Sequence, residues 1–368
     1  MKFITEKNEI VDSLQIGASI AERRQTIPIL ANLRIIAKDK KVEITATDLE
    51  IQIKTDTEVK EIIEEGEITV SARKMSELCK SMPDKEPLEF NLKNGKLAVS
   101  SKDFHADFAT ISALDFPELE IKEETNSFSI SSGVLQRLLN KTAFCMASQD
   151  VRYYLNGLLV EYKEGEVNAV ATDGHRLAVA TSQIEKTSEI EGERQIIPRR
   201  AVLELIKILK QGKENIKISF GNSSFSIEDK NLDFSTKLID GKFPDYEKVL
   251  PAGNPSALEV AKESLQSALS RASVLSNEKY RGVRFALDKN SLKLTANNPE
   301  KESAEEYLDV KYSGDSIEIG FNIGYLLDVL GAIETENVEL NFYGEESSCL
   351  IREPGNKTEV YVIMPMRL

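Results

Sequence analysis

The sequence has little of what catalytic and metal-binding proteins usually need. Its 368 residues include three cysteines and two histidines. An odd number of widely separated cysteines provides neither a disulfide framework nor a paired-cysteine zinc or redox site, so we interpret Cys79, Cys145 and Cys349 as reduced, small apolar residues. Glycine-rich phosphate loops, a nucleophile elbow and a zinc-binding HExxH phrase are also absent. We therefore predict no metal and no cofactor.

Long apolar runs are missing as well. None approaches the roughly 18 to 20 residues that a membrane-spanning helix requires, and the opening MKFITEKNEI lacks the apolar core of a signal peptide. With 41% hydrophobic and 29% charged residues, the composition is typical of a soluble globular protein of two or three domains. We expect a cytoplasmic protein that does not engage a membrane.

Positive charge is in deficit, because 61 acidic residues outnumber 47 basic ones and the formal net charge is −14. This balance argues against a protein that coats phosphates over its whole surface.

What the chain does contain is an internal repeat. Each copy is an alternating strand followed by a small polar turn, and Thr47, Thr172 and Asn297 mark equivalent positions 125 residues apart. The copies are VEITATDLE (42–50), VNAVATDGHR (167–176) and LKLTANNPE (292–300). In each of the three units a strand and a leucine-spaced helix come before this segment, and a second strand and helix come after it. The strands alternate with period two, which is typical of antiparallel sheets with one covered face.

The repeat predicts an α+β fold of three tandem similar domains, with antiparallel sheets outside and two helices per domain. Polar connections near 122–127 and 251–257 place the domains at 1–125, 126–254 and 255–368. The six helices are expected at about 8–24, 72–81, 133–148, 198–211, 261–275 and 321–333.

Charge is distributed unevenly between these helices and the rest of the chain. The helices carry about +6, which leaves about −20 elsewhere in a chain of total charge −14. Twelve helices from two chains at ~9 Å spacing would line a ring with a clear bore of about 24 Å, slightly wider than a DNA duplex of roughly 20 Å. The pattern favours nucleic acid inside a ring; a solvated helix face is the alternative. The cations singled out by charge are Arg73, Arg137, Lys141, Arg199 and Arg200.

The most enzyme-like phrase is ATDGHRL (171–177), in which Asp173 and His175 could form an acid/base pair. The equivalent positions of the other copies lack the histidine, so a structural turn is the favoured interpretation. We predict no catalytic residues. The apolar carboxyl-terminal YVIMPMRL (361–368) has adaptable methionines that suit a peptide-accepting surface.

The whole chain resembles the bacterial sliding clamp family, the beta subunit of DNA polymerase III. The resemblance is carried by SQDVRYYLNGLL (148–159), VATDGHRLAVA (170–180), DGKFPDY (240–246), SNEKYRGVR (276–284), TANNPE (295–300) and YVIMPMRL (361–368). It implies a non-catalytic, head-to-tail homodimeric ring that slides on duplex DNA without sequence preference. It further implies one pocket per chain for short linear motifs of the polymerase III core, the clamp loader, repair polymerases, ligase and mismatch repair proteins.

The resemblance also assigns residues. For DNA contact it implies Arg24, Gln149 and Tyr153, and for the apolar dimer contact Val274 and Leu275. The partner-peptide pocket would consist of Leu155, Thr172, Gly174, His175, Arg176, Leu177, Pro244, Val249, Val362 and Met364, with a second part formed by Arg152, Tyr154, Asn322, Tyr325, Pro365, Met366 and Arg367.

One stretch, KDFHADFAT (102–110), departs from the family pattern where the first domain should meet its partner. Three alternatives therefore stay open: a monomeric peptide-binding scaffold of the same fold, an enzyme that uses Asp173 and His175, and an ordinary DNA-binding protein.

Overall fold

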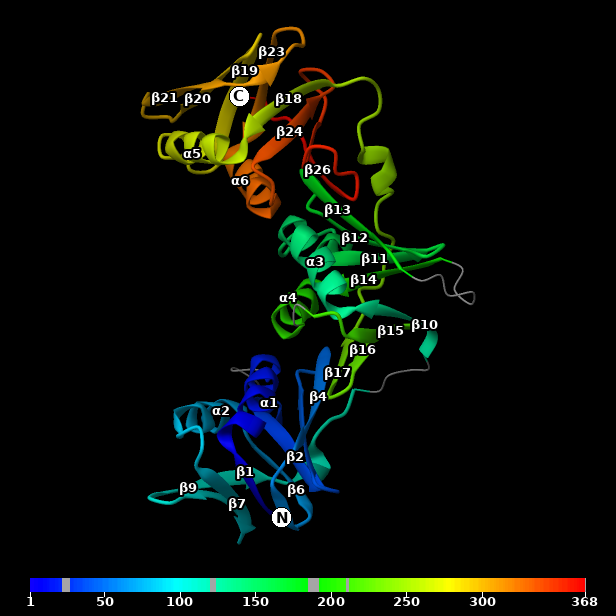
Figure 1. Cartoon of the computed structure of the whole chain (residues 1–368), viewed down its shortest axis with the longest axis vertical. Coiled ribbons are helices and arrows are strands. Elements are labelled where there is room, and N and C mark those ends of the chain that lie inside the picture. Colours follow the sequence, from blue (N-terminus) through cyan, green and yellow to red (C-terminus); the bar gives the residue numbers. More distant parts are fainter. Residues whose placement is uncertain (22–26, 120–123, 185–191, 210–211, 368) are drawn as a thin grey trace. The chain divides into compact units, whose positions relative to one another are not determined.

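The computed structural model describes residues 1–21, 27–119, 124–184, 192–209 and 212–367 (Figure 1). These residues divide into two compact units. The first contains Met1–Gly133 and Leu203–Leu238, and the second contains Val134–Val202 and Ile239–Leu368.

The first unit is built on one antiparallel sheet of 13 strands, in the order β10-β15-β16-β17-β4-β3-β2-β6-β9-β8-β7-β1-β5. The strands are β1 (Lys2–Glu6), β2 (Asn32–Lys38), β3 (Lys41–Thr47), β4 (Ile51–Glu58), β5 (Glu61–Glu64), β6 (Gly66–Ser71), β7 (Pro87–Lys93), β8 (Lys96–Ser101), β9 (Phe104–Ile111), β10 (Glu124–Ser131), β15 (Asn215–Gly221), β16 (Ser224–Asp229) and β17 (Leu232–Lys237).

This sheet joins two of the predicted domains, because β4 pairs with β17 in continuous register. Ile53 stands opposite Phe234, and both are fully buried. Gln52 and Lys54, one position either side, belong to the other face of the sheet, as the period-two alternation requires.

Two helices, α1 (Lys7–Ile20) and α2 (Ala72–Ser81), lie side by side on this unit (Figure 1). Helix α1 buries Ile10, Leu14 and Gly17 at helical spacing against β3 and β4. Gly17 allows the close approach, because a Cβ at this position would lie 2.7 Å from Leu33 Cδ2.

The second unit contains an antiparallel sheet of nine strands, β14-β11-β12-β13-β26-β25-β24-β18-β22, and one of four, β21-β20-β19-β23. The strands are β11 (Gly157–Lys163), β12 (Glu166–Thr172), β13 (Arg176–Gln183), β14 (Glu193–Pro198), β18 (Ser256–Ala261), β19 (Gly282–Asp288), β20 (Ser291–Asn297), β21 (Ser303–Asp309), β22 (Lys311–Tyr312), β23 (Ile317–Asn322), β24 (Asn337–Phe342), β25 (Cys349–Arg352) and β26 (Glu359–Ile363).

The remaining helices are α3 (Ser132–Thr142), α4 (Arg199–Ile208), α5 (Lys262–Ser273) and α6 (Ile323–Ala332). Helix α4 begins in the second unit and its residues from Leu203 onward belong to the first. Helices α5 and α6 contact each other, and α5 packs through Leu265, Ala268 and Leu269. The predicted α+β class with antiparallel sheets is confirmed.

Several predicted helices were too long. The prediction of helix over 133–148 was wrong after Thr142, where a 3-10 turn (Ala143–Cys145) and extended backbone follow. Where the helix ends, backbone carbonyls lack helical partners and accept hydrogen bonds from arginine side chains of the second unit. Arg176 donates to Phe144 O at 2.7 Å, and Arg199 donates to Met146 O at 3.1 Å. The first helix has Ile20 as its last residue, and residues 22–24 of the predicted helix lie outside the described residues.

The repeat appears in the structure as three strands, β3, β12 and β20, that end at the equivalent positions Thr47, Thr172 and Asn297. The turns that follow β3 and β12 have the same bonding. Thr47 Oγ1 donates to Ile51 O at 2.9 Å, and Thr172 Oγ1 donates to Arg176 O at 2.6 Å.

The aspartate after each of these threonines holds the turn together. Asp48 Oδ1 accepts from the backbone N–H of Glu50 and Ile51, and Asp173 Oδ1 accepts from that of His175 and Arg176 at 2.9 and 3.0 Å. Such side-chain to backbone bonds are how aspartate stabilises tight turns. The structure therefore gives Asp173 a structural role in its turn.

All three cysteines are free and buried. Burial raises the pKa of the Cys79 thiol to about 12, and it raises the pKa values of Cys145 and Cys349 as well. In the described ranges no helix is both long and apolar enough to cross a membrane. No described cluster of three or more His, Cys, Asp or Glu side chains is arranged to hold a metal ion.

Candidate functional site

A cavity of about 210 Å³ opens in the second unit. All eleven residues that line it belong to the peptide pocket predicted from the sequence. They are Arg152, Tyr154, Leu155, Thr172, Gly174, Arg176, Leu177, Pro244, Val249, Val362 and Met364.

The floor of the cavity is an apolar cluster held by sheet pairing. Leu177 on β13 stands opposite Val362 on β26, and both are almost fully buried. Leu159 and Phe243 belong to the same cluster, and Val249 packs against it. The cavity therefore offers an apolar surface for a side chain that prefers to leave water.

Arg152 forms one rim of the cavity. Its guanidinium donates to both carboxylate oxygens of Asp150, at 3.0 and 2.9 Å, and to Asp173 O at 3.1 Å. Side-chain and backbone hydrogen bonds from Arg152 lower the pKa of Asp150 to about 2, so this carboxylate is ionised at neutral pH. Gly174, at φ +87°, leaves room for the guanidinium, because a Cβ there would lie 2.8 Å from Arg152 Nη1.

Arg176 lies deeper and ties three segments together. Its guanidinium bonds Asp173 at 3.0 Å, Asp328 of α6 at 2.6 Å and the backbone oxygen of Phe144 at 2.7 Å. The same group lies 4.5 Å from the centre of the Tyr325 ring, which is within cation–π range. The cavity wall on this side is therefore fixed by charge-assisted bonds.

The other six predicted pocket residues are not part of the cavity lining. The His175 ring stacks on the Tyr325 ring with centroids 6.5 Å apart, and Asn322 accepts a 3.2 Å bond from Tyr325 N as the cap of α6. Arg367 is 96% exposed and pairs with Glu346 at 3.5 Å. The full set outside the lining is His175, Asn322, Tyr325, Pro365, Met366 and Arg367.

The terminal segment is anchored beside the cavity. Met364 N donates to His175 O at 2.9 Å, and Met366 N donates to Gly320 O at 2.9 Å. These bonds bring the carboxyl-terminal residues to the turn that holds His175. The imidazole packs on a ring, and Asp173 is engaged by its turn and by Arg176, so the arrangement does not resemble an acid/base pair.

The residues predicted to contact DNA fall into different environments. Arg24 lies outside the described residues. Gln149 and Tyr153 are exposed, and Arg73 is exposed with an ion pair to Glu77 at 2.8 Å. Arg199 donates to Met146 O, and Arg200 on the same helix is partly exposed.

Two of the predicted DNA contacts are used inside the protein instead. Lys141 is only 7% exposed, with Nζ 2.8 Å from Glu334 and 3.3 Å from Glu359, and Arg137 pairs with Glu359. The DNA contact of Lys141 stays a prediction, and within the chain its charge is already compensated by these carboxylates. Arg137 is half-buried and shares that compensation.

The predicted dimer contacts lie after α5. Val274 is 78% exposed, and Leu275 is partly exposed. An exposed valine at this position is available to a second protein surface.

Sequence reasoning missed the residues that hold the arginines in place. Asp150 positions Arg152, and Asp173 and Asp328 position Arg176. For Asp173 the repeat carried a usable signal, since Asp48 occupies the equivalent turn. Asp328 lies 152 positions from Arg176 and had no local signal.

Comparison with known proteins matches the whole chain. Three family models fit in tandem, the DNA polymerase III beta subunit N-terminal domain at residues 1–120, the central domain at 129–245 and the C-terminal domain at 247–367. Curated proteins named "Beta sliding clamp" are 41% identical in Pseudomonas aeruginosa and 40% identical in Escherichia coli K12, over 100% of both chains.

Solved structures also match the whole chain. A Pseudomonas aeruginosa DNA polymerase sliding clamp bound to griselimycin matches with a TM-score of 0.97 at 41% identity, covering 100% of both chains. The Thermotoga maritima DNA polymerase III beta subunit matches with a TM-score of 0.93 at 27% identity, covering 100% of this chain and 99% of that one.

Proposed function

The chain belongs to the DNA polymerase III beta subunit family, and on that basis we propose that it acts as a sliding clamp, the processivity factor of the replicative polymerase. Two copies form a ring around duplex DNA, and the ring tethers other proteins to it. The observation that supports this proposal is the cavity, whose eleven lining residues were all assigned to a peptide pocket from the sequence resemblance. Each chain has three clamp domains, at 1–125, 126–254 and 255–368.

The dimer uses open sheet edges. Between Phe104 and Ala109, β9 pairs only with β8, and β21 pairs only with β20, as far as the described strands go. Both carry exposed apolar or aromatic side chains, with Phe104 38% and Tyr307 65% exposed. An unpaired edge is a template for another strand, so β9 of one copy pairing with β21 of the next would close a head-to-tail ring, with Val274 and Leu275 alongside.

The helices carry the contacts to DNA. Arg24, Arg73, Gln149, Tyr153, Arg199 and Arg200 supply weak, salt-screened interactions that orient the duplex, while the closed ring supplies retention. Arg137 and Lys141 are left out because intramolecular carboxylates already neutralise them. A net charge of −14 keeps DNA off the outer surface.

The cavity captures short linear motifs. An apolar anchor side chain enters above Leu177 and Val362, and residues beside it contact His175, Asn322, Tyr325 and the terminal segment. The partners are the polymerase III core, the clamp loader, repair polymerases, ligase and mismatch repair proteins, all in the cytoplasm. The protein performs no chemistry of its own.

Retention on closed DNA tests this function. The protein should stay on a nicked circular plasmid through gel filtration once a clamp loader has placed it there, and it should run off when the circle is cut with a restriction enzyme. Equal loss from circular and linear DNA would contradict a topological grip.

Sedimentation at micromolar concentration tests the ring itself. A dimer is expected. A monomer would favour the alternative, a peptide-binding scaffold of the same fold. This alternative is considered because residues 102–110 depart from the family pattern.

A further inference from the structure

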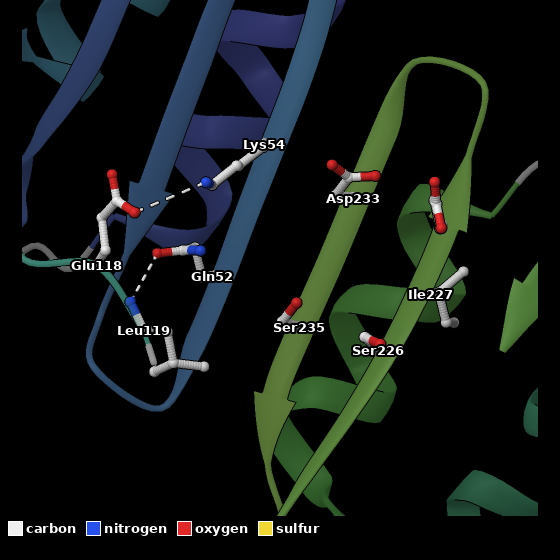
Figure 2. Close-up of a pocket in the computed structure, with 9 residues that line it drawn as sticks. Gln52, Lys54, Glu118, Leu119, Ser226, Ile227, Asp233 and Ser235 are labelled. Carbon is white, nitrogen blue, oxygen red and sulfur yellow. Dashed lines mark hydrogen bonds and ion pairs between the residues drawn. The ribbon is translucent and has the colours of Figure 1, made fainter. Parts of the chain in front are cut away.

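A second cavity, of about 240 Å³, lies in the first unit where β4 pairs with β17 (Figure 2). Its base is one face of the sheet. Lys54, Asp233 and Glu228 form one row across β4, β17 and β16, and Gln52, Ser235 and Ser226 form the next row. Glu118 and Leu119 close one side of the cavity.

The charged row is poorly compensated. Asp233 and Glu228 stand directly opposite each other, with Cβ atoms about 5 Å apart, and like charges in this position are destabilising. Lys54 is opposite Asp233, but its ammonium pairs with Glu118 at 3.9 Å, and Glu228 pairs with Lys217 at 3.7 Å. Asp233 itself forms no ion pair with any described residue.

The neutral row contains two mostly buried residues, Ser235 and Gln52, whose free polar atoms face the cavity. Ser235 is only 4% exposed, and its hydroxyl, which faces the cavity, has no hydrogen-bond partner in the described part of the chain. Gln52 is also 4% exposed; its Oε1 accepts from Leu119 N at 2.9 Å, while its Nε2 points toward β17 and donates to none of the described residues. Both polar atoms are open to the cavity and engaged by no described residue, so they can bond a ligand that enters it.

Burial and the neighbouring carboxylates of Glu228 and Asp56 raise the pKa of Asp233. The charged carboxylate is therefore less favourable here than in water, and a cation placed in the cavity would oppose this effect.

We infer that this cavity binds an arginine residue of a partner polypeptide. The planar guanidinium bonds Asp233 and Glu228, because it offers several donors in a fixed fork that a carboxylate pair accepts. The aliphatic stem lies against Leu119. The backbone carbonyl of the arginine accepts from Gln52 Nε2 and Ser235 Oγ.

The spacing suits this occupant. Residues two apart on a strand are separated by about 6.6 Å, which is the distance between the two rows. An extended arginine side chain covers about 6 Å from Cα to the guanidinium carbon, so its two ends can reach both rows together. A bare metal ion fits poorly, since no described carboxylate cluster is arranged to coordinate one.

The experiment uses the full-length protein and N-acetyl-arginine amide, followed by backbone amide chemical shifts. We expect saturable shifts at Asp233, Ser235 and Gln52. N-acetyl-citrulline amide, which has the same shape without the charge, should give none. Agmatine, which has the guanidinium but no backbone carbonyl, should bind several-fold more weakly.

Two single-residue variants test the role of Asp233 in binding. Asp233→Asn should weaken binding of N-acetyl-arginine amide about tenfold, as loss of a charge-assisted bond predicts. Asp103→Asn removes the same charge from an exposed turn between β8 and β9 and should change nothing. Peptide binding to the cavity around Leu177 should be unaffected by either variant.

Three results would overturn the inference: equal binding of the citrulline compound, equal binding of agmatine, or an Asp233→Asn protein that binds as the wild type does. The citrulline and agmatine comparisons are made on the wild-type protein, so they hold even if the variant folds badly.

Discussion

At the scale of single residues, Gly174 controls how Arg152 sits at the rim of the peptide cavity. Its positive φ favours glycine, and its missing side chain leaves space for the guanidinium that bonds Asp173 O. A methyl group there would force the arginine away from the turn.

Gly174→Ala should therefore weaken binding of a motif peptide several-fold and lower the free energy of unfolding by about 1 kcal/mol, the cost of a left-handed alanine. Fluorescence anisotropy with a labelled peptide and thermal unfolding measure the two effects. Gly355→Ala is the matched control, because Gly355 has φ +78° but open space around its Cα. It should lose the same stability and bind normally; equal peptide affinity in both variants would show that Arg152 does not shape the cavity.

At the scale of elements, a partly buried ion cluster joins α3 to the segments after α6 and β25 and to β26. Lys141 of α3 donates to Ala332 O at 2.6 Å and pairs with Glu334 and Glu359, with Glu353 at 3.9 Å. Removal of the cation would leave the buried carboxylates of Glu353 and Glu359 with less compensation, since only Arg137 would still pair with Glu359, and this costs more than the pair contributes.

Lys141→Met should lower the free energy of unfolding by about 3 kcal/mol at neutral pH, measured by urea titration. Lys311→Met, which breaks an exposed 2.9 Å pair with Glu259, should have little effect. Adding Glu359→Gln to Lys141→Met should restore part of the loss, because a buried carboxylate that has lost one of its two cations is then neutral. A double variant less stable than Lys141→Met would contradict this account.

The effect of Lys141→Met should also depend on pH. The hydrogen bond from Lys141 lowers the pKa of Glu334 below its ordinary value of 4.5. A lowered carboxyl pKa contributes stability above the unfolded pKa, and that contribution is lost as pH falls through the folded pKa. The stability difference between wild type and variant should shrink below pH 4.5; a difference that grew in acid would be inconsistent with the ion pair.

At the scale of the whole molecule, the proposed ring depends on surfaces that are exposed in a single chain. Val274 lies 78% exposed at the end of α5. Val274→Glu should raise the dimer dissociation constant at least tenfold by sedimentation, because a charge would enter an apolar contact, while the chain stays folded. Leu114→Glu, at a leucine that is 88% exposed outside the proposed contact, should leave the dimer intact. Dimers of equal strength in both variants would rule out this interface.

Loading onto DNA and retention on DNA should respond differently when a helix cation is removed. Arg200→Ala should slow loading onto DNA, because a screened contact is lost, while the half-life on nicked circular DNA stays the same. Arg284→Ala, a cation on β19 paired with Glu318, is the control and should change neither. A shorter half-life for Arg200→Ala would show that the helices hold DNA by affinity.

The sequence by itself determined the repeating elements, because period-two strands and their turns are encoded within a few residues. Thr47, Thr172 and Asn297 end three equivalent strands, as their spacing predicts. The pocket residues were found through long family-specific phrases; no local pattern shows that Leu177 will stand opposite Val362.

Only the tertiary structure decided what each charge does. Arg137, Lys141 and Arg200 follow the same basic-helix pattern in the sequence, yet Glu359, 222 positions after Arg137, neutralises the first two. The sequence also could not predict the site at Asp233 and Ser235, because these residues form a site only when β17 pairs with β4. A side chain's charge is local, but its compensation depends on which distant segment the fold brings within a few ångströms.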